Sequence, residues 1–159
     1  MILETILSAV AAIVVPFTRL ADAGIAVLPC AATASSPSFV VSDFTGGTSR
    51  YTGGESFAFY LNTTYDGYHS GCSGSLRKGA DDNGMQWCSA RIPGWNASYV
   101  MTSSHELVVY HDFLCSQEDG TIVTAHAEGL ARLPVTSTAN GKLSMKPASL
   151  MFAASVTMY

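Results

Sequence analysis

The residues of this chain most able to carry chemistry are its four histidines, which can bind metal ions or transfer protons near neutral pH. They are His69, His105, His111 and His126. His105 and His111 are six residues apart, roughly 20 Å on an extended strand, which is too far to share one metal ion. The pattern therefore predicts surface or partly buried histidines and no metal site, with a cluster formed across strands as the open alternative.

Two pairs of adjacent acids, Asp81-Asp82 and Glu118-Asp119, are the next candidates for acid–base work. Both pairs lie in polar, turn-like segments, where acids are normally solvated. Residues 71–74 have the composition of a nucleophile elbow but lack its G-x-S-x-G spacing, and the chain has no phosphate-binding or dinucleotide loop. The sequence therefore predicts no catalytic residue, no cofactor and no enzyme.

The aromatic residues divide into a core group and a recognition group. Phe57 and Phe59 share one strand parity and are expected in the core. Trp95 and Tyr99 lie close to a Pro-Gly turn and a glycosylation triplet, which makes them the candidate exposed pair for recognising a partner. A place at the end of a barrel is the alternative for this second pair.

An N-terminal leader determines how the cysteines and asparagines are interpreted. Residues 6–15 are apolar, and Ala21-Asp22-Ala23 has the small residues that a signal peptidase requires, so residues 1–23 are predicted to be a signal peptide. The start lacks a basic residue, and cleavage after Ala26 is a second option. The alternative to a leader is a retained anchor or a buried core element. A signal peptide predicts a secreted, extracellular protein.

In an extracellular protein, asparagine triplets can be glycosylated and cysteines can form disulfides. Asn62 and Asn96 each begin an Asn-x-Ser/Thr triplet and are candidate N-glycosylation sites, which must then lie on the surface. The four cysteines indicate disulfides, although four cysteines allow three pairings and sequence alone does not choose between them. They contain no C-x-x-C spacing, so structural zinc and thioredoxin-type chemistry fit poorly.

The charge balance excludes one class of partner. The chain has 8 Lys/Arg against 12 Asp/Glu, and its basic residues form no stripe. Binding to nucleic acid depends on clustered basic residues that contact phosphates, so nucleic acid is not an expected partner.

Short apolar segments separated by turns position these residues. Large side chains alternate over residues 56–61, residues 107–110 are β-branched and aromatic, and turn signals recur without an amphipathic helix. The pattern predicts an all-β fold, a small antiparallel β-barrel or sandwich, over residues 38–134. Residues 24–37 are expected to be a flexible mature N-terminus.

The last part of the chain, residues 135–159, is predicted to be a C-terminal extension. Residues 137–141 are small and residues 150–159 are largely apolar, an order that also occurs in GPI signals. A last strand or a frayed end packing on the domain is the favoured interpretation, and a membrane partner is expected only if the tail is a GPI signal.

The order of several motifs resembles that of the fungal secreted proteins named for the major allergen of Alternaria alternata. The motifs are the strand at residues 39–44, Ser56-Phe57-Ala58-Phe59, Cys72, Trp87-Cys88, and the strands at residues 106–115 and 121–129. The resemblance spans roughly residues 39–134. It implies a small antiparallel β fold cross-linked by disulfides, in a family of allergens, elicitors and effectors of plant-associated fungi.

The resemblance also implies a pairing of the cysteines. Cys72 and Cys88 match the family's central disulfide, and Cys115 matches another bonded position. No cysteine follows Cys115, so Cys30 is its remaining partner within the chain. Cys30 could instead link two chains into a homodimer, as an N-terminal cysteine does in the namesake allergen.

The resemblance implies a non-enzymatic effector or elicitor that binds a host plant protein or membrane component. Two other classes stay open. One is a carrier that holds an apolar small molecule inside a barrel walled by Phe57, Phe59, Leu107 and Val109. The other is a cell-wall hydrolase, which requires acids that converge in a groove.

Overall fold

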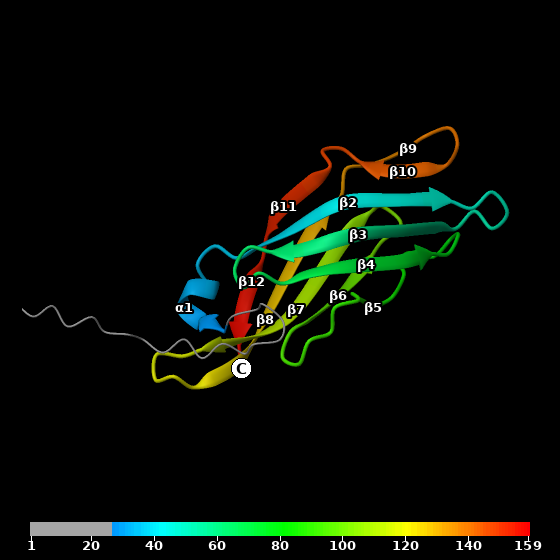
Figure 1. Cartoon of the computed structure of the whole chain (residues 1–159). Coiled ribbons are helices and arrows are strands. Elements are labelled where there is room, and N and C mark those ends of the chain that lie inside the picture. Colours follow the sequence, from blue (N-terminus) through cyan, green and yellow to red (C-terminus); the bar gives the residue numbers. More distant parts are fainter. Residues whose placement is uncertain (1–26) are drawn as a thin grey trace, which may run out of the picture.

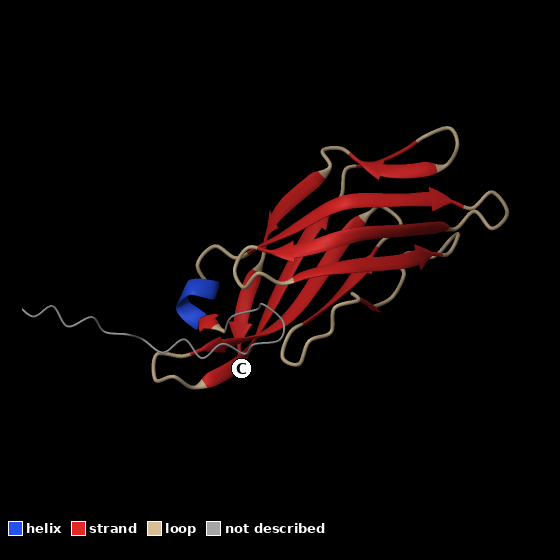
Figure 2. Ribbon diagram, viewed as in Figure 1, coloured by secondary structure: helices blue, strands red, loops and turns tan. Residues whose placement is uncertain are grey.

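The computed structural model of the protein describes residues 27–159. The predicted signal peptide over residues 1–23 lies outside the described residues. Two six-stranded sheets face each other, and one four-residue helix, α1 (Cys30–Thr33), lies beside them (Figures 1 and 2). The predicted all-β fold cross-linked by disulfides is confirmed, and its architecture is a sandwich.

The first sheet is called the β7 sheet after its central strand. Its strand order is β12-β8-β7-β6-β5, all pairs are antiparallel, and β1 adds a short parallel pair at the end of β7. Its strands are β1 (Leu28–Pro29), β5 (Gln86–Trp87), β6 (Asn96–Met101), β7 (Glu106–Ser116), β8 (Ile122–Arg132) and β12 (Ser155–Met158).

The second sheet is called the β2 sheet. Its order is β4-β3-β2-β10-β9, and β11 pairs with the other half of the same edge of β2. Its strands are β2 (Ser38–Thr48), β3 (Glu55–Thr63), β4 (His69–Leu76), β9 (Val135–Ser137), β10 (Lys142–Met145) and β11 (Ser149–Ala153). In Figure 1 strands β2, β3 and β4 cross in front of β6, β7 and β8.

Strand periodicity builds the core between the sheets. Every second side chain of β7 is buried, and so are Phe57, Phe59 and Leu61 of β3. Phe44 stacks on Phe57 and Phe59 at centroid distances of 6.0 and 6.4 Å, and Tyr99 meets Phe59 edge-on at 5.1 Å. Burial of each such ring stabilises the folded state by roughly 1.5–3 kcal/mol. The space between the sheets is therefore occupied by side chains.

A bulge in β2 keeps Phe44 in this core. The register between β2 and β3 shifts between Ser42 and Thr45, and Asp43 adopts a positive φ of 54°. Aspartate tolerates this conformation better than most residues. The backbone N–H of Asp43 donates to the carbonyl of Ala148, 3.2 Å away, in the segment that leads into β11.

The expected boundaries of the domain are wrong at both ends. Residues 28–33 form β1 and α1 and are tied to β7 by the Cys30–Cys115 disulfide, so they are not a free segment. At the other end, residues 135–159 are not a separate extension: β10 and β11 pair with β2, and β12 pairs with β8, which agrees with the favoured interpretation of a last strand that packs on the domain. The sandwich therefore continues to Met158, and a GPI cleavage near residues 137–141 would remove three of its strands.

Candidate recognition face

The outward side of the β7 sheet gathers large aromatic and charged side chains. Strand pairing places Trp87 beside Ser98, Ser98 beside Tyr110, and Tyr110 beside Glu128. A neighbouring row places Asn96, Asp112 and His126 side by side. We call this surface the aromatic face; it consists of Trp87, Arg91, Tyr110, Asp112, His126 and Glu128.

The side chains of the aromatic face contact one another. The Arg91 guanidinium lies 5.1 Å from the centroid of the Trp87 ring, within the range of a cation–π interaction. His126 Nδ1 is 2.7 Å from Asp112 Oδ1, and the imidazole stacks on Tyr110 with 6.0 Å between ring centroids. Trp87 is 46 % exposed, so one large apolar surface stays open to solvent.

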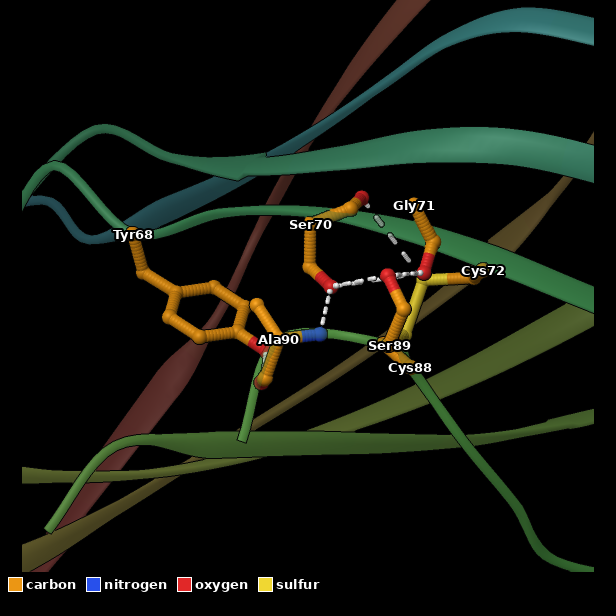
Figure 3. The surroundings of a disulfide bond; sticks show 7 residues. All are labelled: Tyr68, Ser70, Gly71, Cys72, Cys88, Ser89 and Ala90. Atoms are coloured by element: carbon orange, nitrogen blue, oxygen red, sulfur yellow. Dashed lines mark hydrogen bonds between the residues drawn. A yellow bond between two sulfur atoms is a disulfide. The ribbon is translucent and has the colours of Figure 1, made fainter. Parts of the chain in front are cut away.

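The Cys72–Cys88 disulfide and its hydrogen bonds fix the position of Trp87 and Arg91. Strand β5 contributes only two residues to the sheet. The chain directly after it is joined to β4 of the opposite sheet by the disulfide, which Figure 3 shows with its surroundings.

Four hydrogen bonds reinforce this link (Figure 3). The N–H and the hydroxyl of Ser89 donate to the carbonyl of Gly71 at 2.8 and 2.9 Å. The N–H of Ala90 donates to the hydroxyl of Ser70 at 2.8 Å, and the hydroxyl of Tyr68 donates to the carbonyl of Ala90 at 2.6 Å. Because Trp87 precedes this segment and Arg91 follows it, both side chains are presented from a fixed backbone.

Both predicted disulfides are present, with Cys30 bonded to Cys115 and Cys72 to Cys88. No free cysteine remains. Cys30 is therefore engaged within the chain and does not supply the intermolecular link that the homodimer hypothesis requires.

The interpretation of Trp95 and Tyr99 as an exposed pair is wrong. Trp95 is 4 % exposed and Tyr99 is fully buried. The hydroxyl of Tyr99 reaches toward β4, where a Cβ on Gly74 would lie only 2.5 Å from it. Sequence reasoning missed Trp87 instead. A signal was available, because a disulfide-bonded Cys88 faces the core and alternation then turns Trp87 outward.

His111 lies in a buried polar cluster between the sheets. The hydroxyl of Tyr65 is 2.9 Å from His111 Nδ1, and His111 Nε2 is 3.7 Å from Asp66 Oδ2. Burial lowers the pKa of His111 to about 3 and raises the pKa values of Asp66 and Tyr65. These groups are closed to solvent, so their chemistry serves the packing of the sandwich and is not offered to a substrate.

The other predicted candidates lie apart from one another. His105 Nε2 is 3.0 Å from Glu55 Oε2, while the exposed His69 contacts Asn62. Asp82 and Asp119 accept backbone hydrogen bonds within turns, from Gly84 and Thr121. Hydrogen bonding from Thr121 lowers the pKa of Asp119. Within residues 27–159, no three His, Cys, Asp or Glu side chains are placed to hold a metal ion.

The glycosylation triplets lie on opposite sheets. Asn62 is on the outward side of β3 and Asn96 on the outward side of β6, and both are partly exposed. Over the part of the chain that the structure describes, no helix has the length and apolar character needed to cross a bilayer.

Comparisons with known proteins gave no similarity: no family model, no curated protein and no solved structure matches this chain.

Proposed function

We propose that the protein is a secreted binding protein that recognises an extracellular or membrane component of a plant host through the aromatic face and catalyses no reaction. Two intramolecular disulfides are consistent with an extracellular protein. The effector-type role and the plant host come from the resemblance of the strand and cysteine order to the Alternaria allergen family.

The half-exposed pair of Trp87 and Arg91 carries the proposal. Tryptophan, tyrosine and arginine dominate the binding energy of protein interfaces, and a rigid presentation lowers the entropy lost on binding. Here Trp87 and Arg91 flank the disulfide-linked segment, and Tyr110 lies on the far side of the small Ser98.

The geometry favours binding over catalysis. Asp112 and His126 form the arrangement most like an acid–base pair on this face. Nucleophilic catalysis would need a hydroxyl or thiol hydrogen-bonded to the second nitrogen of this imidazole. Among residues 27–159, the only hydrogen bond of the His126 side chain is the one to Asp112.

The carrier hypothesis gains no support from the interior. Phe57, Phe59, Leu107 and Val109 are all buried and packed, and the two phenylalanines are covered by Phe44 and Tyr99. The groove of about 540 Å³ near residues 49–56 and 75–78 is at the surface and not between the sheets.

Replacement of Trp87 tests the proposal. We expect Trp87→Ala to reduce the response of infiltrated leaf tissue at least about 30-fold, since a central aromatic is worth about 2 kcal/mol or more in an interface. The midpoint of thermal unfolding should change little, because the ring is half exposed. The dose–response curve of the purified mature protein measures this.

Met151→Ala is the matched control. Met151 is 64 % exposed but lies on the β2 sheet, away from the aromatic face, and its removal should leave the response unchanged. Equal effects of the two substitutions, or a full response from Trp87→Ala, would contradict the proposal.

A further inference from the structure

The outward side of the β2 sheet differs in chemistry from the aromatic face. By alternation, its paired positions carry mainly small and hydroxyl side chains, and among these described positions none is acidic. Around Asn62 this surface presents Tyr60, His69 and Gly71.

Tyr60 is the single aromatic phenol of this face and lies next to Asn62. The two residues are two positions apart on β3, so both point outward, and Tyr60 is 46 % exposed. Its ring stacks on the imidazole of His69, with 5.2 Å between centroids and 14° between planes. Gly71 is its pairing partner on β4, and a Cβ there would lie 3.8 Å from the Tyr60 ring, so the ring lies directly over this position of β4.

The amide of Asn62 is oriented by the same imidazole. Strand pairing places Asn62 beside His69, and Asn62 Oδ1 is hydrogen-bonded to His69 Nδ1. The amide oxygen therefore faces β4, and the amide nitrogen, which is the atom that carries an N-linked sugar, faces away from it.

We propose that Asn62 carries an N-linked glycan whose first sugar packs against the Tyr60–His69 pair. The attachment forms a bond between the amide nitrogen and the anomeric carbon of a polyprenyl-diphosphate-linked oligosaccharide; the carbon–oxygen bond to the diphosphate breaks, and the amide loses one proton. The apolar C–H surface of the sugar then covers the exposed aromatic surface. The proposal rests on passage through the secretory pathway, as the proposed function does.

Asn96 provides an internal comparison. Two positions before it stands Gly94, so no aromatic side chain of its own strand shares its face. Its neighbour across the sheet is Asp112, a carboxylate, which offers no apolar surface to a sugar. A glycan at Asn96 therefore lacks the same-strand platform that Tyr60 gives Asn62.

The test measures the effect of the glycan on stability separately from the effect of the amino-acid substitution. An Asn96→Gln protein retains only the Asn62 triplet; it is produced with and without Tyr60→Ala, once in a glycosylating eukaryotic secretion host and once in the bacterial periplasm. Glycans are trimmed to one N-acetylglucosamine before thermal unfolding. We expect the sugar to raise the unfolding midpoint by about 2–5 °C when Tyr60 is present and by less than about 1 °C in the Tyr60→Ala protein.

Peptide mass spectrometry shows whether Asn62 is modified. Secreted protein without a sugar at Asn62, or an equal stabilisation in both backgrounds, would overturn the proposal. The leaf response is measured on the same samples. If the sugar stabilises the protein but the protein causes no leaf response, the proposed function is wrong and this inference stands. If the protein causes the leaf response but the sugar does not stabilise it, this inference is wrong and the proposed function stands.

Discussion

At the scale of single residues, His111 shows how burial decides what a titratable group does. Its imidazole is fully buried and lies 4.6 Å from the ring of Tyr68 and 5.4 Å from that of Phe113, between centroids. Its Nδ1 forms a hydrogen bond with the hydroxyl of Tyr65, and its Nε2 lies on the side of Asp66. Burial lowers the pKa of this group to about 3, so it stays neutral at pH 7.

This shift predicts an acid-sensitive fold. In the unfolded chain His111 takes up a proton near pH 6.5, whereas the folded state does so only near pH 3, so stability is lost as the pH falls through this window. At pH 4 the protonation of His111 should lower the free energy of unfolding by about 3 kcal/mol relative to pH 7. Asp66, whose pKa is raised by burial, acts in the opposite sense and offsets part of it. Urea unfolding at pH 7 and pH 4 measures the difference.

Substitution identifies the group responsible. His111→Gln lowers stability at pH 7 but should flatten its dependence on pH, whereas His69→Gln on the exposed surface should keep the wild-type dependence. A pH dependence unchanged by His111→Gln would assign the acid sensitivity to other groups.

The sequence predicted whether a side chain is buried only where the alternation of a single strand was enough to decide it. The core positions Phe57 and Phe59 followed from alternation. Trp95 and Tyr99 did not, because alternation shows that two side chains share a face and does not say which face is buried. That choice depends on pairing with distant strands: Tyr99 is placed inward by its contacts with Phe57 and Phe59 of the other sheet.

At the scale of elements, β5 is the strand most dependent on support from outside its sheet. Only Gln86 and Trp87 pair with β6, and the chain then leaves toward β4 through Cys88. The Cys72–Cys88 disulfide therefore acts locally, on the aromatic face, whereas Cys30–Cys115 closes a longer loop and ties the N-terminal segment to the last residues of β7.

The two disulfides should be separable by function. Loss of Cys72–Cys88 through paired Ser substitutions should cost about 3 kcal/mol, and loss of Cys30–Cys115 about 4.5 kcal/mol, because the longer loop restricts the unfolded chain more. Binding should follow the reverse order: the Cys72/Cys88 variant loses the leaf response while still folded, and the Cys30/Cys115 variant retains it. Unfolding curves and the leaf assay on both variants decide this, and a parallel loss of stability and response would refute a local role.

The strands that sequence predicted well are the long, regular ones. The segments at residues 56–61 and 107–110 lie within β3 and β7, as their alternation and β-branched composition indicated. A last strand or frayed end was expected to pack on the domain, but the separate strands after residue 134 were not predicted, because they are short and their partners β2 and β8 lie far away in the sequence.

At the scale of the whole molecule, the C-terminal strands join the two sheets. β11 belongs to the β2 sheet and β12, which follows after Ala154, belongs to the β7 sheet. Phe152 lies 5.7 Å from Phe39 between ring centroids, and Gly129 is close enough that a Cβ there would lie 3.0 Å from the carbonyl of Ala153. This side of the sandwich is therefore closed by the last residues of the chain.

A truncation after Ala148 should abolish folding. It removes β11 and β12, exposes Phe39 and leaves one half of the β2 edge unpaired. Removal of Tyr159 alone, which is 81 % exposed, should change the unfolding midpoint little. Circular dichroism and secreted yield of the two shortened proteins test this, and a stable, cooperatively unfolding chain ending at Ala148 would show that the last strands are dispensable.

The pairing of Val41 with Leu150 also sets an order in time. During synthesis, β3 and β4, and later β6, β7 and β8, can form from neighbouring segments as they emerge, but the second edge of β2 waits until residues 142–153 have been synthesised. Before these segments emerge, the nascent chain presents two unsatisfied strand edges, one on β2 and one on β8, which pairs with β12. Rapid completion of residues 149–158, and chaperones that cover these two edges until then, should set the yield of folded protein more than the stability of the finished sandwich.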